Sequence, residues 1–232
     1  MSERVVRCTG ISRTYQEESV PVQALQEVDF EVARGEFVSL AGPSGSGKST
    51  LLNIIGGLDR PDAGEVEVDG VLLNTLSESE LSDLRLAKMG FVFQSYNLIP
   101  VLSARENVEF IMQLQGVDAA QRGERAAQVL RELGIDSMAD RRPGELSGGQ
   151  QQRVAVARAI VTHPVLLLAD EPSANLDSQT TRELLELLRT LNETHGVTII
   201  AATHDPMVMS YARRRVNLRD GRIVEDVSNE AV

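Results

Sequence analysis

The chain has 232 residues, a formal net charge of −11 and a hydrophobic fraction of 42%, a size that suits one large α/β domain or two modest lobes. No apolar run approaches the ~20 residues that span a bilayer, and the first ten residues lack the apolar segment of a signal peptide, so a cytoplasmic protein is expected. Because nucleic-acid-binding proteins usually present a basic face, the acidic balance argues against DNA or RNA as the main partner. The densest basic run, residues 213–215, is interpreted as solvated surface.

Residues 1–75 are predicted to form short strands joined by turns, with one helix over residues 49–58. Gly and Asp at the boundaries are typical turn residues. Residues 16–25 are interpreted as an extended loop, and Cys8, the single cysteine, as a small buried residue of the first strand. The strands are expected at residues 5–15, 25–32, 36–42 and 64–73.

Residues 76–145 are predicted to be mostly helical. The amphipathic stretch 119–134 ends at Gly134, where a helix C-cap would fall, and a short strand is expected at residues 89–94. Capping-box spacing marks two helix starts, at Ser77 with Glu80 and at Ser103 with Glu106.

Residues 146–227 return to an alternation of helices and buried strands. Continuous apolar strands separated by helices indicate a mostly parallel sheet covered on both faces. The predicted fold class is α/β, a single unit of residues 1–232 whose helical insertion starts near residue 76 and reaches residue 145, or about 160 with the helix that follows. Helices are predicted at residues 148–163 and 178–194, the second closed by His195–Gly196, and strands at residues 164–170 and 197–204.

The stretch GPSGSGKST follows a predicted strand, opens a predicted helix and fits the pattern G-x-x-x-x-G-K-[ST]. Such glycines let backbone N–H groups curl around phosphate oxygens, and the helix points its positive N-terminus at the anion. Lys48 is expected to reach the β- and γ-phosphates and the Ser49 hydroxyl to ligate Mg²⁺. A nucleoside triphosphate is therefore the predicted ligand. The alternative, a flexible turn that matches the pattern by chance, is disfavoured by the strand before the loop and the helix after it. The expected nucleotide-binding residues of the loop are Gly42, Pro43, Ser44, Gly45, Ser46, Gly47, Lys48, Ser49 and Thr50.

Two adjacent carboxylates end the apolar strand VLLLADEP. Ligands bind outside the carboxyl ends of such strands, so both acids are expected to face the phosphate site. Because successive side chains on an extended strand point to opposite faces, Asp170 is assigned to Mg²⁺ and Glu171 to an attacking water. The alternative, a solvated acidic loop, is disfavoured in a protein with a phosphate-binding loop, so hydrolysis is predicted.

The stretch LSGGQQQR precedes a predicted helix. Ser147 and Gln150 have capping-box spacing, while Gly148 and Gly149 cost helix propensity. Two glycines suit a helix N-terminus that an anion must approach closely. The spacing leaves open whether this second helix start touches the same nucleotide.

Together these residues resemble the ATP-binding subunit of an ABC transporter over essentially the whole chain. GPSGSGKST is similar to the Walker A element, LLLADE to Walker B and LSGGQ to the family signature. The resemblance implies a RecA-like core with an N-terminal antiparallel β subdomain and a helical subdomain, Mg²⁺ and ATP as cofactors, and ATP hydrolysis. It also implies that two cassettes pair head to tail, so that the signature of one contacts ATP held by the other. The signature residues are Leu146, Ser147, Gly148, Gly149 and Gln150.

Four further residues match family elements. By resemblance, Gln94 contacts Mg²⁺, His204 contacts the γ-phosphate, Asp177 lies at the dimer interface and Tyr15 stacks on adenine. The catalytic residues are then Glu171, His204 and Lys48, and the metal ligands Ser49, Gln94 and Asp170. From the sequence alone, Gln94 could simply close a strand and Tyr15 could pack within one.

Details such as GGLDRPDAGEV resemble the macrolide-export and lipoprotein-release group, although SAN at residues 173–175 departs from the TGN that is commonest there. This resemblance implies a homodimer on the inner face of the cell membrane, serving a permease with a large extracytoplasmic domain. The alternatives are a soluble ABC ATPase that acts on ribosomes or DNA, and a nucleotide-gated regulator of a membrane-linked cell-wall enzyme. The transported substrate is not encoded in these motifs.

Overall fold

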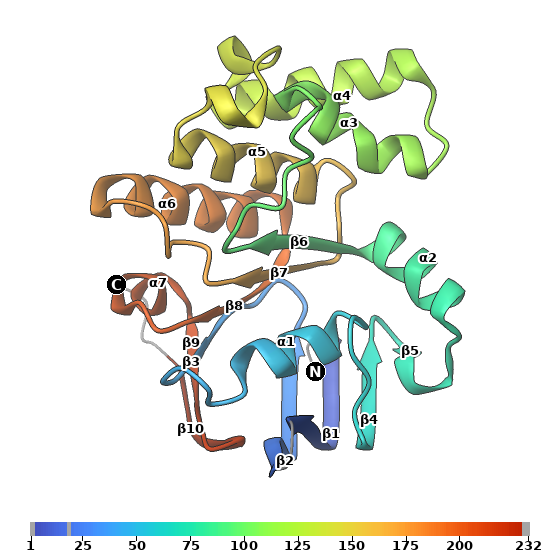
Figure 1. Cartoon of the computed structure of the whole chain (residues 1–232), viewed down its shortest axis with the longest axis vertical. Helices are drawn as coiled ribbons and strands as arrows, with labels where there is room; N and C mark the ends of the chain where they lie inside the picture. The colour runs from blue at the N-terminus through green and yellow to red at the C-terminus, as the bar shows by residue number, and fades with distance from the viewer. Residues whose placement is uncertain (1–2, 18–19, 229–232) are drawn as a thin grey trace.

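The structure, a computed structural model, describes residues 3–17 and 20–228 and folds them into two sheets with helices between and around them (Figure 1). One sheet has four antiparallel strands; the other has six strands, whose neighbours run parallel except that β10 (Arg222–Ser228) is antiparallel to β9 (Arg214–Arg219). The four-stranded antiparallel sheet has the order β2 (Val20–Ala33), β1 (Arg4–Glu17), β4 (Ala63–Val68), β5 (Val71–Leu72). The six-stranded sheet has the order β10 (Arg222–Ser228), β9 (Arg214–Arg219), β3 (Phe37–Ala41), β8 (Thr198–Thr203), β7 (Leu166–Asp170), β6 (Met89–Phe93).

The first two strands form one long hairpin instead of shorter strands with a loop between them. β1 and β2 have 14 residues each, and Tyr15 pairs with Val22 and Gln16 with Pro21. The predicted extended loop over residues 16–25 is therefore wrong, apart from residues 18–19, which lie outside the described part. Proline lacks the N–H that a central strand donates, but β2 is the edge of its sheet, where proline is tolerated.

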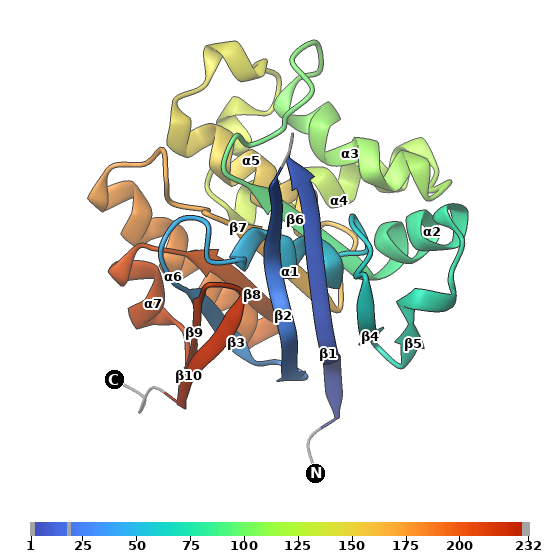
Figure 2. The same cartoon turned by 60° about the horizontal axis from the view of Figure 1, so that its bottom comes forward.

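The six-stranded sheet separates two hydrophobic cores, because successive strand side chains point to opposite faces. On β7, Leu167 belongs to one core and Leu168 to the other. Helix α1 (Lys48–Ile55) lies between the two sheets, where it buries Leu51 and Ile55 (Figures 1 and 2). Both faces of the sheet are covered, which confirms the prediction from its continuous apolar strands.

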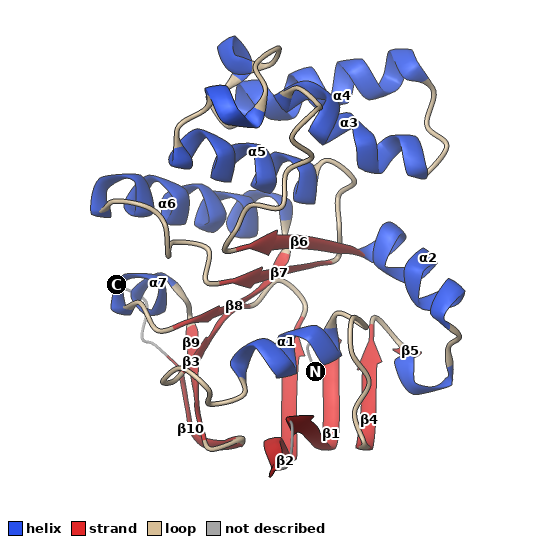
Figure 3. Cartoon of the chain, in the orientation of Figure 1, coloured by secondary structure: helices blue, strands red, loops and turns tan. Residues whose placement is uncertain are grey.

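Helices cover the opposite face of the six-stranded sheet in two layers (Figure 3). α5 (Gly148–Ile160) and α6 (Ser178–His195) lie next to the sheet, and α3 (Ala104–Leu114) and α4 (Ala119–Glu132) pack onto α5. The remaining helices are α2 (Glu78–Lys88), α7 (Pro206–Tyr211) and the short 3₁₀ turns η1 (Leu73–Thr75), η2 (Asp136–Met138) and η3 (Pro143–Glu145). None of the helices in residues 3–17 and 20–228 is long and apolar enough to cross a membrane.

The predicted helix caps are confirmed. Ser77 and Ser103 each accept a hydrogen bond from the backbone N–H three residues later and complete capping boxes. Gly134 directly follows Leu133, the C-cap of α4, and has a φ of +66°. Gly196 is the C-cap of α6 and is also in the left-handed conformation. These positions are set by contiguous residues, so the local sequence predicts them.

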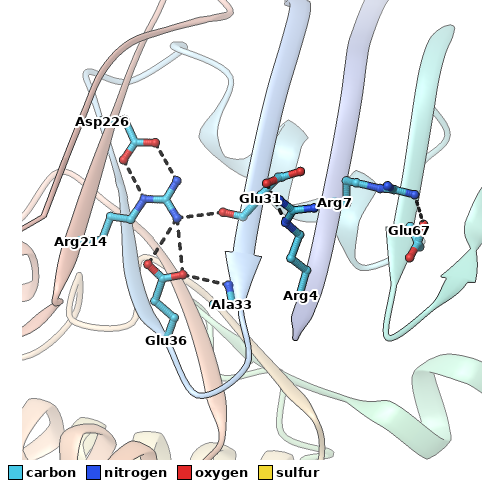
Figure 4. A network of polar contacts seen from close by, with 8 residues as sticks. All are labelled: Arg4, Arg7, Glu31, Ala33, Glu36, Glu67, Arg214 and Asp226. Carbon is cyan, nitrogen blue, oxygen red and sulfur yellow. Dashed lines mark hydrogen bonds and ion pairs between the residues drawn. The ribbon is translucent and has the colours of Figure 1, made fainter. Parts of the chain in front are cut away.

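The basic run 213–215 is not simply solvated surface, and that prediction is wrong for Arg214. Its guanidinium forms two hydrogen bonds to Asp226 of β10, donates to the carbonyl of Glu31 on β2 at 2.8 Å and pairs with Glu36 (Figure 4). Only 20% of the side chain is exposed. Its contacts with Glu31 on β2 and with Glu36 in the connection from β2 to β3 join the β9–β10 hairpin to the edge of the antiparallel sheet. Because they are remote in sequence, the basic run alone could not predict them.

Candidate functional site

The glycine-rich loop runs from the end of β3 into α1 with glycines at positive φ. Gly42 has φ +148°, Gly45 +78° and Gly47 +103°. A Cβ atom at Gly42 would lie 2.2 Å from the carbonyl oxygen of Leu218, and one at Gly47 would lie 2.5 Å from that of Ala24. Steric contact with neighbouring backbone therefore adds to the conformational need for glycine at both positions.

Lys48 is buried within this loop, with 6% of its surface exposed. Its Nζ donates to the carbonyl oxygens of Gly42 at 2.8 Å and Pro43 at 3.0 Å. An ammonium has three donors, and a buried cation is best stabilised by an anionic partner. The hydroxyl of Ser46 is also buried in the loop and has no hydrogen-bond partner among the described residues. These polar groups suit a phosphate chain.

Asp170 ends β7 beside the start of α1. The Ser49 hydroxyl donates to its Oδ1 at 2.9 Å. Burial raises the pKa of the Asp170 carboxyl, while the hydrogen bond from Ser49 opposes that shift. A hydroxyl and a carboxylate side by side supply the hard oxygen ligands that Mg²⁺ prefers, so these residues fit the predicted metal site.

The backbone turns at Glu171, directly after Asp170 at the end of β7. The expectation that both residues lie on one extended strand is therefore wrong. The φ of Glu171 is +47°, in the left-handed region, and its N–H donates to the carbonyl of Ala202 on β8 at 2.8 Å. The two carboxylates contact different residues, Asp170 contacting Ser49 and Glu171 contacting His204, and the left-handed conformation of Glu171, not strand alternation, directs them apart. Such a conformation in a non-glycine residue stores backbone strain, which is common at functional sites.

His204 follows β8 and faces this turn. Its Nδ1 lies 2.8 Å from Oε1 of Glu171, and its N–H lies 3.4 Å from Oε2. The carboxylate is 15% exposed and the imidazole 69%. A sheltered carboxylate with an exposed ring beside it can accept a proton from a molecule in the adjoining cavity.

A cavity of about 500 Å³ adjoins these groups. Predicted residues line it: Tyr15, several residues of the glycine-rich loop, Gln94, Glu171 and His204. The signature residues and Asp177 do not line it. Val22 and Ala24 on β2 are not among the predicted residues, because the sequence predicts a loop over residues 16–25; the alternation of Val20, Val22 and Ala24 is the signal that could have found them. The lining residues are Tyr15, Val22, Ala24, Ser44, Gly45, Gly47, Lys48, Ser49, Thr50, Gln94, Glu171 and His204.

The signature residues lie elsewhere, at the N-terminus of α5. Ser147 and Gln150 form the predicted capping box. A Cβ at Gly149 would lie 2.5 Å from the Thr180 methyl, and one at Gly148 would lie 2.9 Å from the Tyr96 hydroxyl. Packing within the chain therefore already disfavours larger residues at both glycines.

Asp177 caps the neighbouring helix, α6. Its Oδ1 accepts from the N–H groups of Gln179 and Thr180, both at 3.0 Å, and its Oδ2 from the Thr180 hydroxyl at 2.7 Å. Hydrogen bonds from the Thr180 backbone and side chain lower the pKa of the Asp177 carboxyl. Thr180 packs near Gly149 of α5, so the signature and Asp177 lie together, and none of these residues is among those that line the cavity.

The glycine-rich loop between a parallel strand and a helix, with two carboxylates at the end of β7 and a histidine after the neighbouring β8, defines a P-loop nucleotide-binding protein of the α/β class. The family described as ABC transporter matches residues 25–174. An ABC transporter ATP-binding protein of Thermotoga maritima, described as uncharacterized, is 47% identical and covers 95% of this chain and 94% of its own length. The chain belongs to the ABC transporter family as an ATP-binding domain, which confirms the family prediction.

Two further relatives give the structural and functional context. Two dimeric solved structures of MJ0796, a protein of Methanocaldococcus jannaschii, each match this chain with a TM-score of 0.91. Their sequence identities are 42% and 41%, and the matches cover 98% of this chain and 100% of theirs. The first is described as bound to ADP and Pi. They confirm the predicted cassette fold. The macrolide export ATP-binding/permease protein MacB of Marinobacter nauticus is 46% identical over 99% of this chain, which spans 36% of that protein.

Proposed function

We propose that this chain hydrolyses ATP with its own Lys48, Glu171 and His204 and uses the resulting closure of a dimer to drive a separate membrane permease. The observation that supports this most is the convergence of these three residues on one cavity, with the Glu171 carboxylate 2.8 Å from the ring of His204. Phosphoryl transfer is catalysed mainly by positioning and electrostatic stabilisation, and this site supplies a buried cation and a sheltered base for both.

Mg²⁺ would be held by Ser49, Asp170 and Gln94. The first two are in hydrogen-bond contact, and Gln94 lines the same cavity after β6. Hydroxyl, carboxylate and amide oxygens are ligands of this hard cation. When bound, the ion would supply positive charge that offsets the negative charge of the phosphates.

The chain's own residues have two roles in this proposal, nucleotide binding and proton transfer. Lys48 and the N–H groups of the glycine-rich loop bind the β- and γ-phosphates, and the ring of Tyr15 stacks on adenine. Glu171 accepts a proton from the attacking water, and His204 orients the Glu171 carboxylate and contacts the γ-phosphate. Positioned base catalysis of this kind contributes about 10²–10⁴ in rate.

We propose a head-to-tail homodimer in which the signature of one copy closes over the cavity of the other. The α5 N-terminus and Asp177 lie together without lining the chain's own cavity, and the relative MJ0796 is described as dimeric. A helix N-terminus carries partial positive charge that favours a phosphate. Both sites of such a homodimer would hold the complete set of catalytic residues.

The permease partner is proposed from the relatives. MacB is named as an ATP-binding/permease protein for macrolide export, and this chain is similar to its ATP-binding third. We therefore propose export or extrusion of a macrolide, peptide or lipoprotein, with this subunit on the inner face of the cell membrane and the permease carrying an extracytoplasmic domain.

Sedimentation velocity of Glu171→Gln tests the proposed motor. We expect a dimer with Mg-ATP and a monomer with Mg-ADP, while Lys48→Ala stays monomeric with both nucleotides. A Glu171→Gln variant that stays monomeric at saturating ATP would contradict the dimer mechanism.

Capture of the same ATP-loaded Glu171→Gln variant from detergent-solubilised membranes tests the partner. Recovery of a permease with few membrane helices is expected. Recovery of ribosomes or DNA-bound proteins without a membrane chain would contradict the transporter role, and recovery of a cell-wall enzyme with the permease would favour a regulator.

A further inference from the structure

The ring of Tyr15 is held from two sides by residues whose role in the site has not been assigned. Its hydroxyl donates to Oδ2 of Asp59 at 2.6 Å, and the guanidinium carbon of Arg13 lies 4.8 Å from the ring centroid. Arg13 in turn donates two hydrogen bonds to Asp59, at 2.9 and 3.1 Å. Each of the three residues contacts the other two, so the ring cannot turn without breaking one of these contacts.

A second carboxylate anchors this cluster to the backbone of β1. Asp62 accepts from Arg13 at 2.7 Å and from the N–H of Thr14 at 2.7 Å. Asp59 and Asp62 come from the loop between α1 and β4, so the strand that carries Tyr15 is tied to the chain that leaves the phosphate-loop helix. The side chains of Arg13 and Asp59 are 23% and 22% exposed, and such partial shielding strengthens a charged pair relative to a surface one.

The cluster supports the ring from outside the cavity. The described lining residues include Tyr15, Ala24 and Thr50, but neither Arg13 nor Asp59. The guanidinium therefore covers a part of the ring that the cavity does not use. Burial, with the hydrogen bond to Asp59, raises the pKa of the Tyr15 hydroxyl, so the hydroxyl keeps its proton and remains a donor.

We propose that Arg13 and Asp59 are positioning residues that hold the Tyr15 ring in the orientation on which the base of the nucleotide stacks. The inference rests on the proposed function, because it needs a nucleotide whose phosphates lie in the glycine-rich loop. The cluster, which lies outside the cavity, then affects the affinity for the base of the nucleotide, while Lys48 and the glycine-rich loop bind the triphosphate.

Equilibrium binding of two probes, ATP and inorganic tripolyphosphate, tests this division. Stacking on an aromatic ring accounts for up to about 100-fold in affinity per base, so Tyr15→Ala sets the upper limit. We expect Arg13→Gln and Asp59→Ala to weaken ATP binding by about 5- to 10-fold within that limit, with Tyr15→Phe, which keeps the ring but loses the hydroxyl, weakening it less. Tripolyphosphate affinity should stay at the wild-type value in all four variants, which also shows that the loop is folded. Arg7→Gln, on the same strand but paired with Glu67, is the matched control and should change neither affinity.

A double-mutant cycle separates positioning from general stability. In the Tyr15→Ala background, Asp59→Ala should cause no further loss of ATP affinity, because it acts through a ring that is gone. Equal losses for ATP and tripolyphosphate, additive losses in the cycle, or unchanged ATP affinity in Arg13→Gln and Asp59→Ala would each overturn the inference. A wild-type chain that binds neither probe would instead overturn the proposed function itself.

Discussion

Nδ1 of His204 lies 2.8 Å from Oε1 of Glu171, and the N–H of His204 lies 3.4 Å from Oε2 of the same carboxylate. The two residues follow β7 and β8, which are neighbouring parallel strands. One residue thus contacts both oxygens of the carboxylate and fixes its orientation. When both ring nitrogens carry a proton, Nδ1–H donates to Glu171 and the outer nitrogen, Nε2, can donate to a phosphate oxygen.

Replacing His204 separates the roles of its two nitrogens. The amide of His204→Asn can donate to Glu171 in place of Nδ1–H, but it lacks an Nε2. Because the proposed contact with the γ-phosphate belongs to Nε2, we expect His204→Asn and His204→Ala both to lower steady-state ATP turnover by about 100-fold. Wild-type turnover in His204→Asn alone would show that the ring only orients Glu171.

Lys48→Ala should weaken nucleotide binding before it affects chemistry. The variant loses the buried ammonium of the loop, and a hydrogen bond to a charged group contributes about 1.5–3 kcal/mol, so the dissociation constant for ATP should rise by roughly 10- to 150-fold. Isothermal titration of ATP measures it, with Lys88→Ala, which loses an ion pair with Asp69 outside the cavity, as control. Equal ATP affinity in the two variants would refute the assignment of Lys48.

Asp170→Asn should stabilise the fold while abolishing hydrolysis. Burial raises the pKa of the carboxyl, so the folded state favours its protonated form and ionisation destabilises the fold. That penalty is absent below the unfolded pKa near 3.8 and complete once the pH exceeds the raised folded value. At pH 7 we expect thermal unfolding about 2–4 °C higher in the variant, a gain on the order of 1 kcal/mol.

The difference between wild type and Asp170→Asn should shrink as the pH falls toward 4, because the wild-type carboxyl then becomes neutral as well. Thermal unfolding without nucleotide at several pH values is the measurement. A variant that is less stable at pH 7, or a difference independent of pH, would contradict the assigned cause.

Gly149→Ala should destabilise the chain despite the higher helix propensity of alanine. The new Cβ would lie 2.5 Å from the Thr180 methyl, and the Thr180 hydroxyl is bonded to Asp177, so the methyl cannot rotate away without losing that bond. Overpacking costs about 1–3 kcal/mol, more than the ~1 kcal/mol that propensity returns.

Thr180→Ser supplies the matched rescue, since it removes the methyl and keeps the hydroxyl. Urea unfolding of Gly149→Ala, Thr180→Ser and the double variant measures the coupling. We expect the double variant to recover most of the lost free energy of unfolding. If the effects of the two substitutions simply add, this steric explanation fails.

The sequence predicted features that contiguous residues determine. The spacing from Gly42 to Lys48 places a lysine at the start of the helix that follows the loop, and Ser103 with Glu106 forms a capping box, because both involve only neighbours along the chain. The alternation of helices with apolar strands likewise indicated the parallel sheet, since each strand must bury both of its faces.

Features that depend on distant partners were missed or wrongly explained. Val22 joins the cavity because β2 pairs with β1, and Arg214 is shielded because Glu36 and Asp226 converge on it from other elements. The left-handed backbone of Glu171 is held by a hydrogen bond to Ala202 on β8. The partners of Arg214 and Glu171 leave no signal in the residues beside these two, so their contacts become visible only in the fold.

The most direct test of the proposed site is to measure ATP affinity and ATP turnover together for wild type and Glu171→Gln. Glutamine keeps the size of the side chain but cannot accept the proton of the attacking water. We predict turnover about 10²–10⁴-fold lower, or roughly 3–5 kcal/mol of lost transition-state stabilisation, with ATP affinity retained. Glu186→Gln, on the exposed side of α6, should keep wild-type turnover. Wild-type turnover in Glu171→Gln would contradict the assignment of Glu171 as the base and, with it, the proposed mechanism.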